Sequence, residues 1–184
     1  MRRISIIGSS GSGKTTLAQI LSDVLGIPHL ELDSVYHQRG WKPLPDEDLR
    51  AVVRPLVEQS AWVIDGNYAR TGVQKIIWAR ADTIVWLDLS RARTMWRVTV
   101  RSFGRCMTRQ ELWNGNRESW SNLVSRDPEE NIIMWTWTRY ASNRQRYVQD
   151  MAEAGDDGPT WFHLRTPREV DDFVAAVGSW AVEP

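Results

Sequence analysis

The feature that most limits what this chain can fold into is an eight-residue segment near its start. The segment reads G-S-S-G-S-G-K-T over residues 8–15, directly after an apolar run, Ile4–Ile7, and directly before a helical pattern over Thr15–Leu25. Its glycines let backbone N–H groups turn toward one anion, and the first turn of the helix directs its free N–H groups and its dipole at the same point. The segment therefore predicts a strand–loop–helix unit that binds phosphate.

The rest of the chain alternates between short strand-like runs and longer helical patterns, which indicates an α/β fold. The expected strands are Ile4–Ile7, His29–Leu32, Trp62–Asp65, Thr83–Asp88 and Thr160–Leu164. The expected helices are Thr15–Leu25, Asp46–Gln59, Ala92–Cys106, roughly Pro128–Ala154, and Pro167–Trp180. Pro128 and Pro167 suit first-turn positions, with Asp127 and Thr166 as N-caps. Such short apolar strands are typical of a parallel sheet covered on both faces.

Length and composition favour one globular domain over residues 1–184, because 184 residues are enough for a single core. The chain is 42% hydrophobic and 25% charged, and no apolar run is long enough to cross a bilayer. No apolar segment typical of a secretory signal follows Met1, so we expect a cytoplasmic protein that does not contact membranes. The single cysteine, Cys106, excludes an intramolecular disulfide.

Positive charge gathers in one segment although the whole chain is neutral, with 23 basic and 23 acidic residues. Between Arg91 and Arg117 there are seven arginines and one acid, Glu111. Five of the arginines recur every four residues: Arg93, Arg97, Arg101, Arg105 and Arg109. An apolar stripe runs beside them: Trp96, Val100, Phe103 and Met107. We therefore expect a helix with one buried face and one cationic face, and the repulsion between neighbouring arginines predicts a bound anion such as polyphosphate.

The segment that follows this helix, residues 107–126, lacks clear periodicity and contains Asn114-Gly115-Asn116. We expect it to be a mobile lid. Trp113 and Trp120 within it have no obvious apolar partners, so they are candidates either to stack on a base or to pack under the folded lid. We call residues 107–126 the lid segment.

With these motifs in view, the chain resembles the nucleoside and nucleotide kinase branch of P-loop proteins, in which residues 8–15 are the Walker A motif. Within that branch it is most similar to the adenylate-kinase-related DNA topology modulation (FlaR-like) proteins. The likeness also rests on residues 29–33 with Trp41, on residues 62–70, and on residues 82–88, and it covers nearly the whole chain. It implies a five-stranded parallel sheet in the order 2-3-1-4-5, flanked by helices, and a phosphotransferase that uses ATP/ADP and Mg²⁺.

The phosphate loop and the resemblance together assign a donor site. Lys14 is expected to bridge the outer phosphates, Thr15 to place its hydroxyl on Mg²⁺, and Asp65, at the end of a buried strand, to hold the water shell of the metal. The resemblance implies that Arg97 and Arg101 contact the nucleotide, one on adenine and the other on phosphate. The expected nucleotide-binding residues are Gly8, Ser9, Ser10, Gly11, Ser12, Gly13, Lys14, Thr15, Thr16 and Arg97.

The acceptor side carries two signals that point to different chemistries. Residues 65–71 are similar to the D-G-F-P-R-T segment of adenylate kinases, with one residue inserted and the proline absent, which implies that Arg70 reaches a phosphate on the acceptor. Asp33, at the end of the second expected strand, would instead orient or deprotonate a hydroxyl group, or would act as an N-cap. Arg139, Asn143 and Arg146 share a helical face, and Arg144 lies close by. One or two of them either close on the transferring phosphoryl group or form structural ion pairs.

Three functions follow, in order of expectation. The first is an Mg²⁺–ATP-dependent kinase of a nucleoside monophosphate. The second is a kinase of a hydroxyl acceptor, such as a nucleoside or another small metabolite. The third is an ATP-binding regulatory protein that affects DNA topology, although the neutral net charge and the lack of a DNA-reading motif argue against specific nucleic-acid binding.

Overall fold

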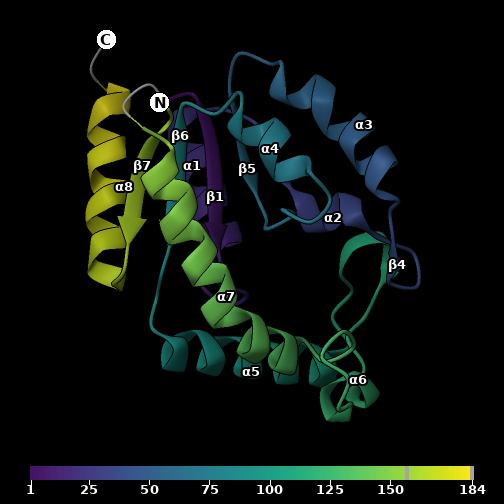
Figure 1. The fold of residues 1–184 in the computed structure, drawn as a ribbon. Helices are drawn as coiled ribbons and strands as arrows, with labels where there is room; N and C mark the ends of the chain where they lie inside the picture. The colour runs from purple at the N-terminus through teal and green to yellow at the C-terminus, as the bar shows by residue number, and fades with distance from the viewer. Residues whose placement is uncertain (156–157, 183–184) are drawn as a thin grey trace.

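A five-stranded parallel sheet forms the middle layer of the structure, a computed structural model that describes residues 1–155 and 158–182 (Figure 1). Its strands are β1 (Arg3–Gly8), β2 (His29–Glu31), β5 (Trp62–Asp65), β6 (Thr83–Leu87) and β7 (Thr160–Leu164). They lie in the order β2-β5-β1-β6-β7. A separate antiparallel hairpin, β3 (His37–Gln38) with β4 (Lys42–Pro43), accounts for the gap in the numbering. Counted without that hairpin, the order is 2-3-1-4-5, so the predicted sheet is confirmed.

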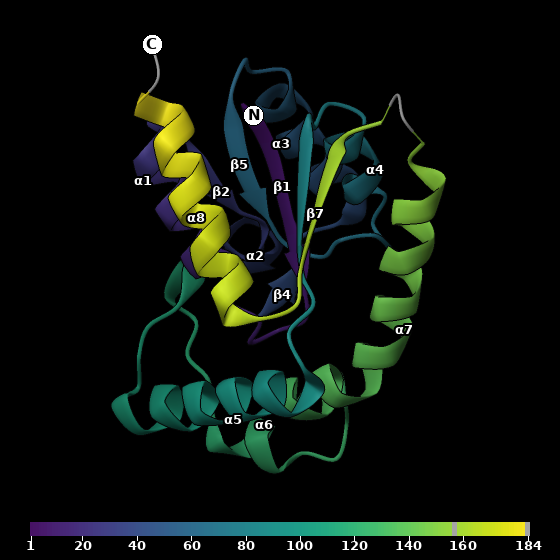
Figure 2. The same ribbon diagram turned by 90° about the vertical axis from the view of Figure 1, so that its left-hand side faces the viewer.

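Helices cover both faces of the sheet (Figure 2). On one face, α1 (Lys14–Leu25) and α8 (Pro167–Val182) bury side chains such as Leu21 and Val177 against β1 and β6. On the other face lie α2 (Leu32–Tyr36), α3 (Asp46–Val57), α4 (Val73–Trp78) and α7 (Ile132–Glu153). The three-layer α/β architecture expected from the sequence is therefore confirmed.

The remaining helices lie beyond the carboxyl ends of the strands. There α5 (Arg91–Thr108) crosses below the sheet, and α6 (Trp120–Val124) lies beneath α5 (Figure 2). A 3₁₀ turn, η1 (Trp113–Gly115), precedes α6, so the lid segment contains short ordered elements. Within the described part of the chain, no helix is both long enough and apolar enough to cross a membrane.

The predicted element ends mostly agree with the structure to within two residues, and the largest difference is at the start of α7. The second strand ends at Glu31, because Leu32 and Asp33 already belong to α2. Helix α7 begins at Ile132 and not near Pro128, because its N-cap is Asn131, whose Oδ1 accepts from the backbone N–H groups of Ile133 and Met134. Asp127 is not an N-cap of α7, since its side chain accepts from the N–H of Glu129 in the preceding turn.

The apolar stripe on α5 was also predicted wrongly, because the structure leaves it exposed. Trp96 is 70% exposed, Val100 50%, Phe103 46% and Met107 74%. The buried face of α5 instead carries small side chains: Thr94, Val98, Ser102 and Cys106. The reason is close packing: a Cβ placed on Gly11 of the phosphate loop would lie 2.7 Å from the carbonyl oxygen of Thr94. Large side chains have no room on that face.

Candidate active site

The phosphate loop connects β1 to α1 and has a conformation that needs glycine. Gly13, the N-cap of α1, has φ 102°, in the left-handed region that side chains disfavour. Gly11 has φ 81° and lies against α5. The Nζ of Lys14 donates to the carbonyl oxygen of Ser9 at 3.1 Å, which curls the loop. The buried hydroxyl of Ser12 finds no hydrogen-bond partner among the described residues. An orphaned hydroxyl inside such a loop suits a phosphate oxygen.

Asn67, just after β5, holds the start of the loop in place. Its Oδ1 accepts from the backbone N–H of Gly8 at 3.2 Å, and its Nδ2 donates to the carbonyl oxygen of Gly8. The Asn67 side chain thus pairs the N–H and carbonyl groups of Gly8 on the side of β5, whose ladder with β1 ends at Asp65. The phosphate loop is therefore fixed to the strand that carries Asp65.

The structure brings the two expected metal-binding residues together. The hydroxyl of Thr15 donates to Asp65 Oδ2 at 2.7 Å and lies 3.1 Å from Glu31 Oε1. Asp65 is 2% exposed, and its other oxygen accepts from His29 Nε2 at 3.0 Å. Hydroxyl and carboxylate oxygens are ligands that Mg²⁺ uses, together with water and substrate phosphates. Among the described residues no group of three His, Cys, Asp or Glu side chains is arranged to hold a metal ion.

Three carboxylates lie within electrostatic reach of Lys14: Asp33, Asp65 and Glu31. Burial lowers the pKa of Lys14, while the negative charges of Asp33 and Asp65, and more weakly Glu31, act in the opposite direction. Burial also raises the pKa of Glu31, and the neighbouring carboxylates Asp65 and Asp33 raise it further. The cluster is therefore electrostatically coupled, and a bound cation or the ammonium of Lys14 stabilises it.

Asp33 lies in the first turn of α2, and a tyrosine fixes its orientation. The phenol of Tyr68 donates to Asp33 Oδ1 at 2.5 Å. Burial and the charge of Asp33 both raise the pKa of Tyr68, so the phenol stays protonated and keeps donating. One carboxylate oxygen of Asp33 is thereby engaged, which leaves Oδ2 for another ligand.

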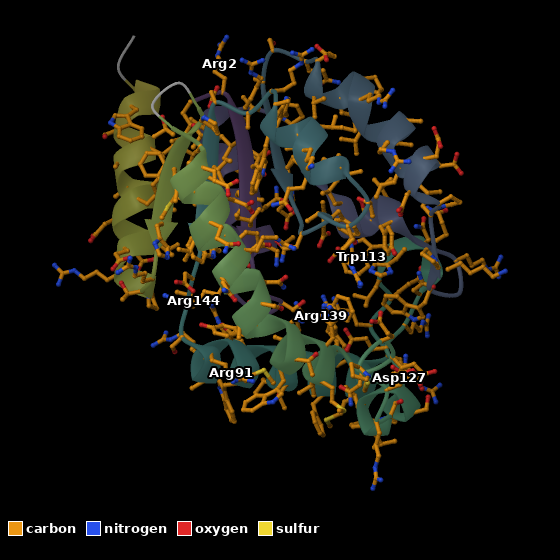
Figure 3. The ribbon with its side chains drawn as sticks, viewed as in Figure 1. Arg2, Arg91, Trp113, Asp127, Arg139 and Arg144 are labelled. Atoms are coloured by element: carbon orange, nitrogen blue, oxygen red, sulfur yellow. The ribbon has the colours of Figure 1, made fainter. Side chains whose placement is uncertain are left out.

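Aromatic rings line the region next to Asp33. The rings of Tyr36 and Tyr68 lie 4.7 Å apart between centroids, and His37 stacks on Trp113 at 5.8 Å. The indole N–H of Trp113 also donates to Glu31 Oε2 at 2.8 Å, although the two residues are 82 positions apart in the chain. Figure 3 shows Trp113 beside α2. The lid segment thus reaches the carboxylate that contacts Thr15.

Asn116 ties the lid segment to the β3–β4 hairpin. It is 4% exposed, and its Oδ1 accepts from the N–H groups of Gly40 at 2.8 Å and Trp41 at 3.0 Å. Its Nδ2 donates to the carbonyl oxygen of Gln38 at 2.9 Å. Asn114 adds a contact from its Nδ2 to the carbonyl oxygen of His37 at 2.7 Å. We call the contacts of Asn116 the lid latch.

Some arginines of α5 contact or face the phosphate loop, and another pairs with the lid segment. Arg97 Nη1 donates to the carbonyl oxygen of Ser12 at 3.3 Å, so it reaches the phosphate loop, and its expected contact with nucleotide stays a prediction. Arg101 lies within electrostatic reach of Lys14, Glu31 and Asp33. Arg105 pairs with Glu118 at 2.8 Å. Glu118 lies just beyond the run of arginines, so part of the unrelieved repulsion inferred from the sequence is neutralised within the chain.

Two predicted site residues are not joined to this cluster. Arg70 is exposed and forms no ion pair or side-chain hydrogen bond with any residue the structure describes. Arg139, on α7, lies 3.5 Å from Glu129 and 4.8 Å from the centre of the Trp135 ring, which is the structural alternative for this residue (Figure 3). Their assignment to the acceptor and the phosphoryl group stays a prediction.

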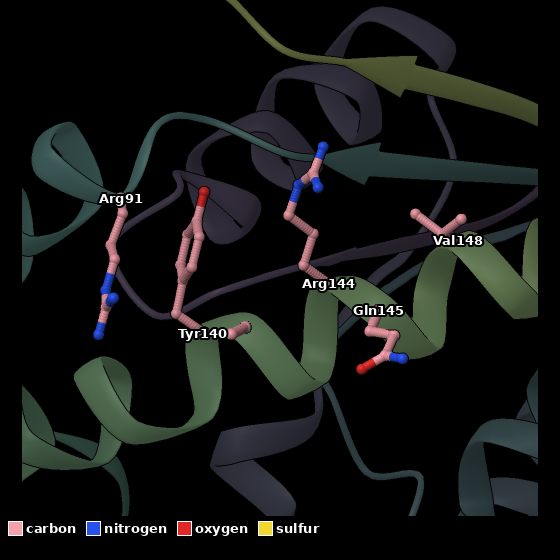
Figure 4. Close-up of a pocket in the computed structure, with 6 residues that line it drawn as sticks. Arg91, Tyr140, Arg144, Gln145 and Val148 are labelled. Atoms are coloured by element: carbon pink, nitrogen blue, oxygen red, sulfur yellow. The ribbon is translucent and has the colours of Figure 1, made fainter.

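A hollow of about 440 Å³ lies elsewhere, along α7 and the start of α5 (Figure 4). Both of its arginines already have partners. Arg144 pairs with Asp88 at 3.0 Å, and Arg91 donates to the carbonyl oxygen of Trp137 at 2.9 Å and stacks on its ring. Arg144, a candidate to reach the phosphoryl group, lines this hollow in its pair with Asp88, whereas neither the phosphate loop nor Asp33 does.

Sequence reasoning assigned no role to Glu31, Asn67, Tyr68 or Asn116, although it quoted most of them within motifs. The signal for Tyr68 and Asn67 was their position directly after Asp65, at the carboxyl end of a strand next to the phosphate loop. For Asn116 no local signal exists, because its partners lie about 75 residues earlier in the chain.

No family model matches this chain. A cytidylate kinase of Nitratidesulfovibrio vulgaris (strain DP4) is 37% identical over 46 residues, which are 25% of this chain and 20% of that protein. A shikimate kinase of Enterococcus faecalis (strain ATCC 700802 / V583) is 41% identical over 46 residues, 25% of this chain and 27% of that protein. The match thus spans only about a fifth to a quarter of the length of these curated relatives.

Similarity to solved structures covers the whole chain. The crystal structure of shikimate kinase from Bacteroides thetaiotaomicron has a TM-score of 0.59 at 15% identity, over 97% of both chains. A sugar kinase from Janibacter sp. HTCC2649 has a TM-score of 0.51 at 17% identity, over 98% of this chain and 94% of the other. At such identities the likeness establishes the fold, and the narrower resemblance to FlaR-like proteins stays an expectation. The chain therefore has a P-loop kinase-like fold.

Proposed function

We propose that this protein is an Mg²⁺–ATP-dependent kinase that transfers the γ-phosphoryl group to a hydroxyl group of a small molecule. One observation carries the proposal: the carboxylate of Asp33, oriented by Tyr68, lies within electrostatic reach of Lys14 at the end of the sheet that carries the phosphate loop. In this proposal Asp33 is the base for the acceptor and Lys14 is the cation for the donor phosphates, two roles that phosphoryl transfer needs in one site.

In this proposal one group of residues binds ATP and Mg²⁺, and Asp33 accepts the proton. Backbone N–H groups of the loop, with Lys14, hold the outer phosphates of ATP, and Arg97 adds positive charge from the side of α5. Thr15 and Asp65 would hold Mg²⁺, which neutralises charge on the phosphates. The acceptor oxygen forms a bond to the γ-phosphorus, the bond to the ADP oxygen breaks, and Asp33 takes the proton of the hydroxyl group.

The surroundings of Asp33 favour a hydroxyl acceptor over a phosphorylated one. Glu31 and Asp33 would repel a phosphate dianion, whereas a hydroxyl group can donate to either carboxylate. The rings of Tyr36, Tyr68 and Trp113 supply an apolar wall of the kind that small-molecule sites use. The two structural relatives described above, a shikimate kinase and a sugar kinase, support the same preference by analogy of fold.

A nucleoside monophosphate, the acceptor first expected from the sequence, is the second candidate. The match to cytidylate kinases supports it, and Arg70 is exposed and uncommitted at the end of the β5 segment. A monophosphate acceptor would give Arg70 the anionic partner that the described chain does not provide.

A pair of variants separates the two acceptors. A panel of hydroxyl compounds, nucleosides and nucleoside monophosphates is first assayed for acceptor-dependent release of ADP. With the active acceptor, Asp33→Asn is expected to lower kcat by about 10²–10⁴-fold, the usual contribution of a positioned base, while Arg70→Ala changes KM little. Asp171→Asn and Arg168→Ala, on α8, are the matched controls.

The opposite pattern identifies a monophosphate acceptor. In that case Arg70→Ala raises the acceptor KM strongly at unchanged ATP affinity, and Asp33→Asn is the milder change. If an active acceptor is found and neither variant affects its turnover, the acceptor does not bind at Asp33 and the proposal is wrong.

A further inference from the structure

The exposed apolar stripe of α5 has the spacing of a helix–helix seam. Its residues, Trp96, Val100, Phe103 and Met107, are separated by four, three and four positions. At 3.6 residues per turn they fall within an arc of about 60°. A helix that packs on its own core carries a stripe wider than about 100°, whereas a narrow stripe with alternating steps of three and four is the pattern of a coiled-coil interface. We call these four residues the α5 seam.

The exposed apolar surface continues from the α5 seam onto Trp120 and Val124 of α6. Together these six residues form a larger apolar patch than an ordinary free surface has. The ring of Trp120 packs edge-on against Phe103 at 5.5 Å, and Val124, one turn further along α6, is 79% exposed. With side-chain areas of about 150–250 Å² for the large residues, the exposed fractions correspond to roughly 700 Å² of apolar surface. That area exceeds the largest patch on most monomers and approaches the ~800 Å² that one partner contributes to a stable interface.

We propose that a second copy of this chain covers the α5 seam, with the two α5 helices antiparallel across a twofold axis between Val100 and Phe103. In that pairing Trp96 of one protomer lies opposite Met107 of its partner, and Val100 lies opposite Phe103. Each contact joins a larger side chain to a smaller or more flexible one, so the seam is complementary to itself, as a twofold interface requires.

The placement of the arginines favours a second copy over a lipid surface. A helix that lies on an anionic membrane uses basic side chains beside its apolar face to contact headgroups. Here Arg97 donates to the phosphate loop and Arg105 pairs with Glu118, so both are turned toward their own chain. Their engagement also keeps these two positive charges away from the twofold contact.

The mass of the protein in solution tests the proposal. By sedimentation and by light scattering after gel filtration, the parent chain is expected to be a dimer with a dissociation constant of about 10 µM or lower, as interfaces of this area allow. Val100→Asp and the double variant Trp96→Gln/Met107→Gln are each expected to weaken the dimer at least tenfold. The double variant changes only side chains that are 70% and 74% exposed, so it should leave the protomer folded, as circular dichroism can check.

Val148→Asp on α7 is the control, since Val148 is 42% exposed and lies outside the seam. A parent chain that stays monomeric at about 100 µM would overturn the proposal, and so would a dimer that the seam variants leave intact. Co-sedimentation of a monomeric parent with phosphatidylserine vesicles would assign the seam to a membrane instead and would equally overturn it. Because the readout is mass and not ADP release, failure here is distinct from failure of the proposed kinase activity.

Discussion

The lid latch can be broken with one substitution, Asn116→Ala. The change removes three well-formed hydrogen bonds, at 2.8, 3.0 and 2.9 Å, and leaves the N–H groups of Gly40 and Trp41 without their acceptor. At about 0.5–1.5 kcal/mol for each bond, the loss comes to about 2–4 kcal/mol. Because these bonds join the lid segment to the hairpin and do not hold the sheet together, we expect local opening and not global unfolding.

Amide hydrogen exchange measures that opening directly. A loss of 2–4 kcal/mol corresponds to exchange that is about 30- to 700-fold faster at residues 37–43 and in the lid segment, with core amides of β1 and β6 unchanged. Added ADP with Mg²⁺ should restore part of the protection if the segment is a lid that closes over nucleotide.

Asn122→Ala is the matched control, because Asn122 lies in the same segment but its side chain makes one hydrogen bond among the described residues, accepting from the hydroxyl of Ser121. Exchange at the hairpin should then stay at the parent rate. If Asn116→Ala also leaves the hairpin amides protected, the latch does not hold the lid segment. If every amide of the chain exchanges faster, Asn116 supports the whole fold and the reasoning about a local latch is refuted.

Three further predictions concern the donor site, stability and DNA. Lys14→Ala removes a charge-assisted contact worth about 1.5–3 kcal/mol, so calorimetry should find ATP binding weakened about 10- to 150-fold, and equal affinity would contradict the donor site. Burial of Asp82 opposes its ionisation, but hydrogen bonds from Thr83 and from the N–H groups of Arg2 and Arg3 outweigh this and lower the pKa of Asp82 below its ordinary value. In urea unfolding, the parent should therefore have a higher free energy of unfolding than Asp82→Asn. This difference should be complete above about pH 4 and should decrease as the pH falls through the lowered pKa of Asp82; a difference that persists at pH 2 would contradict the prediction. Duplex DNA should bind weakly and be displaced by saturating ATP, because the proposed function uses Arg97 and Arg101 for the phosphates of ATP. Sequence-selective binding in the presence of ATP would contradict that role.

The sheet was predictable because its strands are short, apolar and separated by periodic helices. Trp62–Asp65 and Thr160–Leu164 have the predicted ends, since buried strands of a parallel sheet form continuous apolar runs. The hairpin β3–β4 and the short helices α2, α4 and α6 were not predicted, because tertiary contacts stabilise them. Helix α6, for example, is five residues long, too short to form by propensity.

The donor half of the site was predictable and the acceptor half was not. Residues 8–15 carry their chemistry in a local motif. Thr15 meets Asp65 because α1 begins directly after the loop that follows β1, and the neighbouring strand β5 ends at Asp65. The contacts of Asp33, Glu31 and Asn116 join segments 35 to 82 positions apart, and no local pattern encodes such pairs. The exposure of the α5 stripe was missed for another reason: periodicity shows that a face is apolar, but not which surface covers it.

The strand order also determines when the site can form as the chain leaves the ribosome. The central strand β1 is made first, yet both of its neighbours come later: β5 begins 59 positions after β1 and β6 begins 80 positions after it. Asn67 and Asp65 are therefore synthesised in time to close the phosphate loop once about the first third of the chain has emerged, well before α5 and the lid segment exist. Non-local pairing of this kind slows folding, so during synthesis the nascent chain exposes the apolar edge of β1 until β6 arrives. ATP, if it binds the loop at that stage, would stabilise the half-formed sheet before α5 and the lid segment are present.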